Sequence, residues 1–118
     1  DCFDVATTFD AIHDQAHPMA VLAGVNRMLR SGGTYLCVEP KASSLLEENM
    51  QDPMASFMYT VSTMHCMTVS LAYGGEGLGT AWGHQTATEY LTDAGFTEIE
   101  ITGVRDDRSN NYFISKKP

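Results

Sequence analysis

The sequence predicts an α/β fold in which helices cover a mainly parallel four-stranded sheet. Three observations point to this class: a strand–helix–strand unit at the start, a helical middle, and a late helix followed by two strands. A strand, a helix of about four turns and a second strand form a βαβ unit, which gives parallel and buried strands. With 118 residues, of which 43% are hydrophobic and 19% charged, the chain has the size of one folded domain.

The first unit is defined by its strand and helix signals. Phe3–Phe9 is rich in β-branched and aromatic residues and is predicted to be a strand. A helix then begins at Pro18, which the first turn tolerates, and ends at Gly32-Gly33. Thr34–Val38 follows as a second strand, closed by Glu39-Pro40. One face of the helix is apolar and comprises Val21, Leu22, Val25, Met28 and Leu29.

The middle of the chain is predicted to be a helical arm. Leu45–Met50 is a short helix, and apolar residues recur at helical spacing from Met54 onward. Five of the seven methionines lie in this arm. Methionine either fills an irregular core or lines an adaptable apolar pocket, and both readings stay open. The glycine-rich segment Gly74–Gly79 ends the arm.

The last third of the chain returns to regular patterns. A helix opens at Thr86 or Thr88 and is capped by Gly95. The segment from 96 to 102 alternates apolar and acidic residues, so a strand with both isoleucines facing inward is expected. A charged turn leads to a final strand at Tyr112–Ile114.

Charge excludes two classes of partner. The formal net charge is −8, and no Lys or Arg occurs from Ala42 to Val104. Nucleic acids and anionic membrane surfaces require clustered positive charge, so neither is expected as a partner. No apolar run reaches 18 residues, and therefore no membrane-spanning helix is predicted.

The cysteines and the first residues indicate a cytoplasmic protein. Cys2, Cys37 and Cys66 are an odd set without close pairing, which favours reduced thiols, with Cys37 and Cys66 in the core. The first ten residues are acidic where a signal peptide is basic.

Several segments resemble the C-terminal half of class I S-adenosylmethionine-dependent methyltransferases. The likeness is carried by FDVATTFDAIHDQAHP (Phe3–Pro18), LRSGGTYLCVEP (Leu29–Pro40), AGFTEIEI (Ala94–Ile101) and the closing NNYFISKKP. The FDxxHD loop, the Met-rich arm and Gly77–Gly83 are similar to an uncharacterised methyltransferase subfamily. The resemblance implies a Rossmann-like fold with neighbouring strands in the order 4-5-7-6, the last strand being antiparallel.

The resemblance also implies a single partial methyltransferase domain over residues 1–118. Residues 1–40 form the strand–helix–strand unit, 41–83 the helical lid with the glycine-rich loop, and 84–118 the late helix with the terminal strand pair. The family's GxGxG cofactor turn would precede residue 1, so weak or absent binding of S-adenosylmethionine to this chain alone is expected. The first strand would expose an apolar edge that favours a homo-oligomer, a dimer in the simplest case.

The family's cofactor wall falls on the loop after the first strand. The resemblance implies that Phe9 and Asp10 contact the methionine part of S-adenosylmethionine through backbone groups. Ile12 and His13 line the same wall, at the carboxyl end of a parallel strand where open α/β sheets bind ligands.

The arm and the segment after it supply the candidate substrate residues. Met58, Tyr59 and Trp82 combine apolar surface with a few polar groups, as a small-molecule pocket requires. Methyl transfer needs a general base only if the acceptor loses a proton, and His65 and His84 are the candidate catalytic bases.

Two motifs have simpler interpretations as loops. His13 and His17 mimic part of a zinc-binding HExxH pattern, but Pro18 biases His17 away from helical angles, so no metal is predicted. Gly75–Gly79 resembles GxGxG but follows a helical segment instead of a strand.

We therefore expect a C-terminal segment of a methyltransferase that acts on a small molecule and is inactive alone. A non-enzymatic, self-associating half-domain is the alternative. A metal hydrolase that uses His13 and His17 is a third hypothesis.

Overall fold

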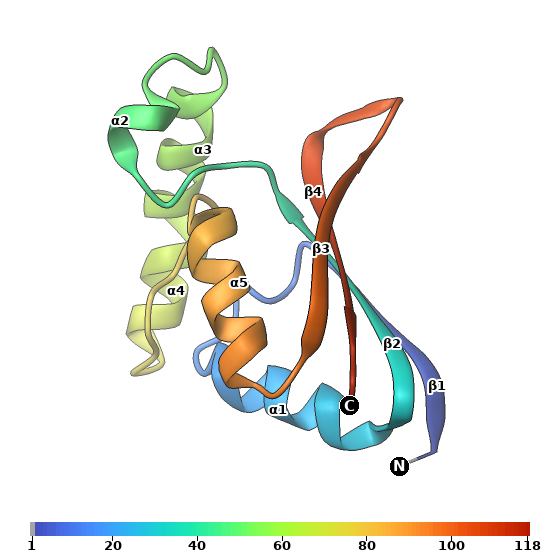
Figure 1. Ribbon diagram of the computed structural model, residues 1–118. Helices are drawn as coiled ribbons and strands as arrows, with labels where there is room; N and C mark the ends of the chain where they lie inside the picture. Colours follow the sequence, from blue (N-terminus) through green and yellow to red (C-terminus); the bar gives the residue numbers. More distant parts are fainter. Residues whose placement is uncertain (1) are drawn as a thin grey trace.

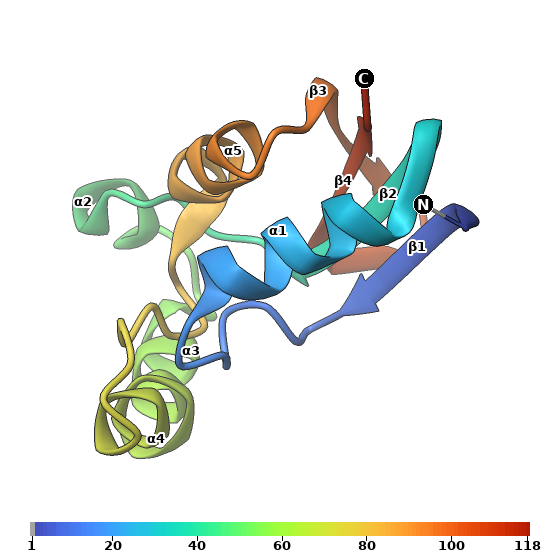
Figure 2. The same ribbon diagram turned by 90° about the horizontal axis from the view of Figure 1, so that it is seen from below.

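The computed structural model describes residues 2–118 and shows a four-stranded mixed sheet with its helices on one side (Figure 1). The strands are β1 (Phe3–Phe9), β2 (Leu29–Pro40), β3 (Thr97–Val104) and β4 (Asp107–Lys116). The helices are α1 (Pro18–Met28), α2 (Leu46–Asn49), α3 (Ala55–Val61), a π-helical turn (Ser62–Cys66), α4 (Met67–Ala72) and α5 (Gly83–Asp93). Viewed from below, α1 and α5 lie against the sheet, while α3 and α4 stand farther out (Figure 2).

The sheet has the topology that the sequence predicts. Its strand order is β1-β2-β4-β3, which is the expected order 4-5-7-6. β1 and β2 are parallel, and β4 runs antiparallel to both of its neighbours. Three strands therefore point one way and the last strand points the other way, as expected.

β1 forms an edge of the sheet and is apolar. Among the described residues, its only strand partner is β2. The side chains of Phe3, Val5 and Phe9 are 52%, 58% and 60% exposed. The apolar edge expected from the sequence is therefore confirmed.

The boundary between α1 and β2 differs from the prediction. α1 ends at Met28, and the chain continues directly as a strand from Leu29, so the glycines at 32 and 33 lie inside β2. The cause is tertiary pairing: Phe3 of β1 lies opposite Leu29, and the Cys2 amide donates to the Met28 carbonyl at 2.9 Å. A side chain at Gly33 would stand 2.8 Å from the Arg30 carbonyl oxygen, which requires glycine there.

The last helix begins earlier than predicted. α5 starts at Gly83, where φ is +82° and a Cβ atom would lie 2.1 Å from the Ser44 amide nitrogen. The hydroxyl of Ser44 accepts the Thr86 amide at 3.0 Å. A residue from a distant segment thus satisfies the first turn, and local capping patterns do not reveal it.

The inward pattern expected for β3 holds for only one of its isoleucines. Ile99 is half-buried and packs on the core, whereas Ile101 is 42% exposed, so the inward prediction for Ile101 is wrong. Glu98 has a φ of +51°, and the register against β4 shifts between Thr97 and Glu100. An irregularity of this kind breaks the strict alternation of a strand.

The core lies between the sheet and its two covering helices. Tyr35 of β2 stacks on Phe96 with ring centroids 5.1 Å apart. Cys37 and Cys66 are buried free thiols, as predicted. The central cluster comprises Ile12, Leu22, Val25, Leu29, Tyr35, Cys37, Trp82, Ala87, Leu91, Phe96 and Phe113.

Residues 41–82 form the helical arm and turn small polar residues inward. Ser62, Cys66 and Ser70 are buried at spacings of four residues. Ser62 and Cys66 contact Thr80, just after the glycine-rich segment, whereas Ser70 accepts the Gly77 amide and donates to the Gln15 carbonyl. By contrast, several large apolar side chains of the arm are exposed, among them Met50 at 70% and Met64 at 78%. Within residues 2–118, no helix has both the length and the apolar character required to cross a membrane.

Candidate functional site

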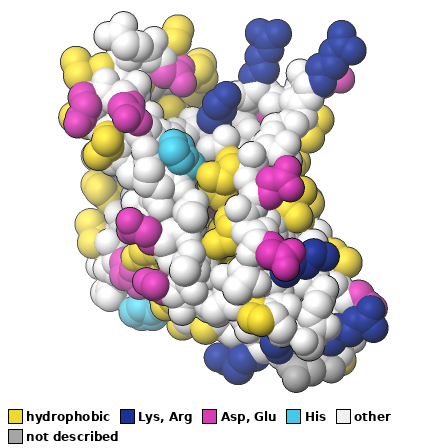
Figure 3. All heavy atoms as spheres, viewed as in Figure 1, with side chains coloured by type: hydrophobic (Ala, Val, Ile, Leu, Met, Phe, Trp, Pro, Cys, Tyr) yellow, Lys and Arg dark blue, Asp and Glu magenta, His cyan; other side chains and the backbone are white. Residues whose placement is uncertain are grey.

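A cavity of about 900 Å³ separates the arm from the carboxyl ends of β1 and β2. Figure 3 shows hydrophobic side chains in the hollow between the helices and the sheet, with basic side chains near the β3–β4 turn. The wall facing the sheet is polar, and the wall formed by α3 is apolar. The lining residues are Asp10, His13, Asp14, Pro40, Lys41, Asp52, Pro53, Met54, Phe57, Met58, Val61, Cys66, Thr80, Arg108, Ser109 and Asn110.

The buried carboxylate of Glu39 organises the polar wall. Glu39 is the penultimate residue of β2 and is 1% exposed. Its Oε1 atom accepts the amides of Ala11 and Ile12 at 3.1 and 2.9 Å. Its Oε2 atom accepts Nδ1–H of His13 at 2.6 Å. One carboxylate therefore fixes both the backbone of the loop after β1 and the orientation of the His13 ring.

His13 is 4% exposed, and Glu39 holds its ring. Burial alone would lower the pKa of His13, but the hydrogen bond and charge of Glu39, with the charges of Asp14 and Asp10, raise it. Because Nδ1 is bonded to Glu39, Nε2 is the ring nitrogen that remains for other partners.

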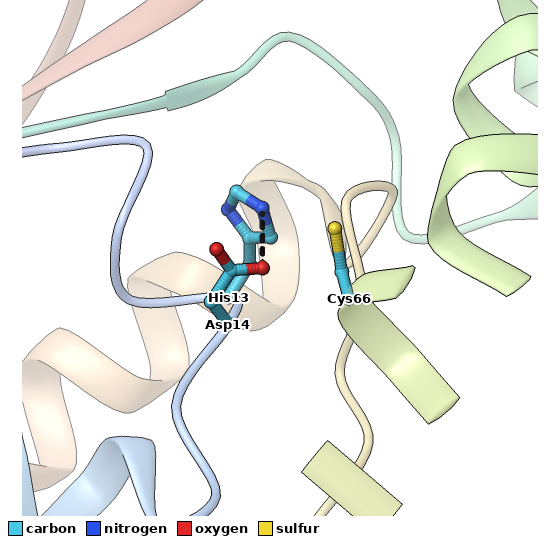
Figure 4. Close-up of side chains that lie close together, drawn as sticks. All are labelled: His13, Asp14 and Cys66. Carbon is cyan, nitrogen blue, oxygen red and sulfur yellow. Dashed lines mark ion pairs between the residues drawn. The ribbon is translucent and has the colours of Figure 1, made fainter. Parts of the chain in front are cut away.

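His13 forms a cluster with Asp14 and Cys66 (Figure 4). Nε2 of His13 lies 3.3 Å from Oδ1 of Asp14. The sulfur of Cys66 belongs to the same group, whose potential ligand atoms all lie within 4.8 Å of one another. It also contacts the hydroxyl of Thr80 at 3.0 Å, and burial raises the pKa of the Cys66 thiol.

Asp10 contributes a carboxylate to the same wall. Its φ is +46°, a left-handed conformation that starts the turn after β1. Its amide donates to the carbonyl of Val38 at 2.9 Å, which continues the β1–β2 pairing. Partial burial and the charge of Glu39 raise the pKa of the Asp10 carboxyl.

The structure brings together some of the residues predicted from the sequence. Asp10, His13 and Met58 line the large cavity. Ile12 lies behind it in the core at 1% exposure, and the side chain of Phe9 is exposed on β1.

The remaining candidates lie elsewhere. Trp82 is buried against Tyr90, with the rings edge to face at 5.9 Å, and Tyr59 accepts a hydrogen bond from Asn49. His65 is exposed on the π-helical turn. His84 lines a separate pocket of about 430 Å³ beside Lys41 and Ser43.

The structure does not pair the two histidines of the HExxH-like segment. His17 is exposed at the start of α1, while the ring of His13 points to Glu39. The residues between them form turns and not a helix, so their side chains do not share a helical face. Gly75 packs against Ala16, where a Cβ atom would lie 2.5 Å from the Ala16 Cα, which fits the loop interpretation of Gly75–Gly79.

Sequence reasoning missed Asp14 and Cys66 as site residues. The signal for Glu39 was its position at the carboxyl end of a buried strand, where ligands bind in open α/β sheets. No sequence signal joins Cys66 to His13, because the two residues meet only when the arm folds over the sheet.

Solved structures share this fold at low sequence identity. Human N-acetylserotonin methyltransferase in complex with S-adenosylmethionine superposes with a TM-score of 0.67 and 15% identity, over 97% of this chain and 29% of that one. An O-methyltransferase family protein from Burkholderia thailandensis matches with a TM-score of 0.67 and 13% identity, over 98% and 30% of the two chains. The structure of PigF with S-adenosylhomocysteine matches with a TM-score of 0.69 and 16% identity, over 99% and 31%.

No family model and no curated protein matches the sequence. The chain spans about a third or less of the three structures that it resembles (29–31%). The shared architecture includes the parallel β1–β2 pair and the antiparallel β4 between β2 and β3. The chain therefore has the fold of the C-terminal part of a class I S-adenosylmethionine-dependent methyltransferase domain.

Proposed function

We propose that this chain is the C-terminal part of an S-adenosylmethionine-dependent methyltransferase that acts on a small molecule. The observation that carries the proposal is the cavity of about 900 Å³ at the carboxyl ends of β1 and β2. Its size is that of a small-molecule site, with an apolar wall and a few convergent polar groups. The methionine- and phenylalanine-bearing helix α3 forms the apolar wall, which suits an aromatic or aliphatic acceptor.

The polar wall fits the amino-acid end of S-adenosylmethionine. That cofactor supplies a methyl group on a positively charged sulfonium. The carboxylate of Asp10, on the loop after β1, would hold the cofactor's ammonium group, and the backbone of Phe9 would lie beside it. The glycine-rich segment Gly75–Gly79 follows α4 and not a strand, so it does not form the GxGxG cofactor turn of the family. We therefore expect weak binding.

His13 is the histidine that would meet the methyl acceptor. Glu39 fixes its ring, and Nε2 is left toward the cavity wall. His65 and His84, the two bases expected from the sequence, do not line this cavity. Positioning of the acceptor by His13 and the α3 wall would be the main contribution of this chain to the reaction.

Titration of the isotope-labelled chain with S-adenosylmethionine, followed by NMR, tests the proposal without requiring activity. We expect chemical-shift changes confined to the cavity wall from Phe9 to His13. Because the binding is weak, calorimetry with S-adenosylhomocysteine should show no micromolar affinity. Changes that are absent at millimolar ligand, or that cluster away from this wall, would contradict the proposal.

A pair of carboxylate variants gives the matched control. Asp10→Asn removes the charge that would hold the ammonium group and should weaken binding by about tenfold, equal to about 1.4 kcal/mol. Asp106→Asn removes an exposed charge on the β3–β4 turn and should leave the titration unchanged.

Self-association through β1 is a second candidate, favoured by the exposed apolar edge. The edge residues Phe3, Val5 and Phe9 are all more than half exposed. An unpaired strand edge with this composition is a template for a second strand. The partner we propose is the β1 edge of a second copy of the chain.

A further inference from the structure

We propose that His13, Asp14 and Cys66 form a binding site for a zinc ion. The three residues offer a nitrogen, an oxygen and a sulfur ligand from two separate elements (Figure 4). His13 and Asp14 come from the loop after β1, and Cys66 comes from the π-helical turn of the arm. The site would thus join the arm to the sheet at the polar end of the large cavity.

The distance between the two loop ligands suits a tetrahedral metal ion. Two ligand atoms that each lie ~2.0–2.1 Å from a tetrahedral zinc are roughly 3.3 Å apart. Nε2 of His13 and Oδ1 of Asp14 are 3.3 Å apart. The Cys66 sulfur lies within 4.8 Å of a ligand atom of each of the other two residues, so a movement of roughly 1 Å by that side chain would complete the three-ligand set.

A carboxylate behind the cluster orients the histidine as zinc sites require. Ligating histidines usually donate their second ring N–H to a carboxylate, which fixes the tautomer and raises the basicity of the ligating nitrogen. Glu39 provides this bond to Nδ1 of His13 at 2.6 Å. Glu39 is itself held by the backbone amides of Ala11 and Ile12, so the histidine is positioned before any metal binds.

The carboxylate of Asp14 supplies an independent indication. Its Oδ1 atom is buried and, apart from the 3.3 Å contact with Nε2 of His13, makes no hydrogen bond within residues 2–118. A buried carboxylate oxygen that makes no hydrogen bond is costly, and a cation bound between it and the imidazole would remove that cost. On the other side of the cluster, the Thr80 hydroxyl lies 3.0 Å from the Cys66 sulfur and can donate to a metal-bound thiolate.

The ligand chemistry selects zinc over magnesium or calcium. A thiolate and an imidazole are ligands for zinc and other late first-row ions, whereas magnesium and calcium require oxygen. A thiolate from Cys66 and the carboxylate of Asp14 would balance the two positive charges. Three protein ligands leave a fourth position, as in zinc sites that bind a substrate or water.

All three ligand residues line the large cavity. The fourth coordination position of the zinc ion would therefore lie next to the space that we assign to the methyl acceptor. A hydroxyl or thiol of the acceptor would then contact the zinc ion instead of the His13 ring. Binding of zinc does not depend on the proposed function.

Titration of the fully reduced chain with Co²⁺ tests the site directly. Co²⁺ replaces zinc and reports its ligands by absorption. We expect one equivalent to give the visible bands of tetrahedral cobalt and a near-ultraviolet thiolate-to-cobalt charge-transfer band. One equivalent of Zn²⁺ should remove both sets of bands.

Variants assign the bands to the cluster. Cys66→Ser should abolish the charge-transfer band, whereas Cys2→Ser, which removes the exposed thiol, should leave it intact. Asp14→Asn should weaken Co²⁺ binding by at least about tenfold, and Glu39→Gln by about 10- to 100-fold. Far-ultraviolet circular dichroism of each variant establishes that the fold is kept.

Two results would overturn the zinc site. One is the absence of a charge-transfer band in the reduced wild-type chain at millimolar Co²⁺. The other is an unchanged band in folded Cys66→Ser, because the metal would then be held by a different thiol. Failure of the NMR titration with S-adenosylmethionine would count against the proposed function alone, since the cobalt measurement contains no cofactor.

Discussion

The sheet region and the helical arm of this molecule are built on different principles. The sheet with α1 and α5 contains nearly all of the large buried side chains, including Leu22, Tyr35 and Phe113 at 0–1% exposure. The arm buries mainly small residues and exposes large ones, such as Phe57 at 61% and Met64 at 78%. Apolar burial therefore stabilises the sheet region, whereas hydrogen bonds hold the arm in place.

The contacts of the arm show how it is held. The hydroxyl of Ser70 donates to the Gln15 carbonyl at 3.1 Å, and the amide of Glu76 donates to the Ala16 carbonyl at 3.0 Å. Hydrogen bonds that are partly open to water contribute little net stability, on the order of 1 kcal/mol each. We therefore expect the arm to open over the cavity at a lower free-energy cost than unfolding of the sheet.

The largest expected effect tests the buried carboxylate of the sheet region. Glu39→Ala leaves the amides of Ala11 and Ile12 and the ring of His13 without their acceptor. Removal of one partner from a buried charged pair costs about 3–5 kcal/mol, so the free energy of unfolding should fall by that amount in urea denaturation. Glu39→Gln keeps an acceptor oxygen and should lose less. Equal losses in both variants would show that the hydrogen bonds of Glu39 contribute little.

A matched pair of apolar truncations compares the two regions directly. Leu22→Ala, at a position with 0% exposure in α1, should lower the free energy of unfolding by about 2–5 kcal/mol. Met64→Ala, at a position with 78% exposure in the arm, should change it by less than about 0.5 kcal/mol. Similar losses measured by urea denaturation would mean that the arm belongs to the same cooperative core as the sheet.

The smallest expected effect is a change in self-association, and it compares the exposed apolar surfaces of β1 and of the arm. Val5→Lys places a charge on the edge strand β1 and should weaken self-association by at least about tenfold, because edge charges oppose strand pairing. Met64→Lys places the same charge on the arm and should leave association unchanged. Sedimentation equilibrium over a concentration series measures both variants. A monomeric wild-type chain at all concentrations, or an effect of Met64→Lys alone, would contradict pairing through β1.

The sequence predicts the fold well where local pattern and tertiary packing agree. Phe3–Phe9 is a strand in the prediction and in the structure, because its β-branched residues favour a strand and β2 pairs with it. The end of α1 was placed too late, since Leu29 can extend a helical face or pair with Phe3, and only the paired strand decides between them. The start of α5 was placed too late because its first turn is completed by Ser44, a residue from the arm.

The candidate site was less predictable from the sequence than the fold. Asp10 and His13 follow a strand at the ligand-binding edge, a position that general rules of α/β sheets indicate. His65 and His84 are compatible with catalysis by residue type alone. Nothing in their sequence spacing shows whether their side chains point into the large cavity. The contact between Cys66 and the loop after β1 depends on how the arm folds back.

The π-helical turn at Ser62–Cys66 determines which side of α4 faces the loop after β1. A π turn contains an additional residue relative to an α turn, which rotates everything after it by roughly 100° about the helix axis. Ser70, which follows this turn, donates to the Gln15 carbonyl in the rotated frame. Deletion of a single residue between Val61 and Cys66 would therefore turn α4 so that its polar side leaves the loop after β1. The length of the segment between Val61 and Cys66 is therefore constrained by the contact that α4 makes with the loop after β1.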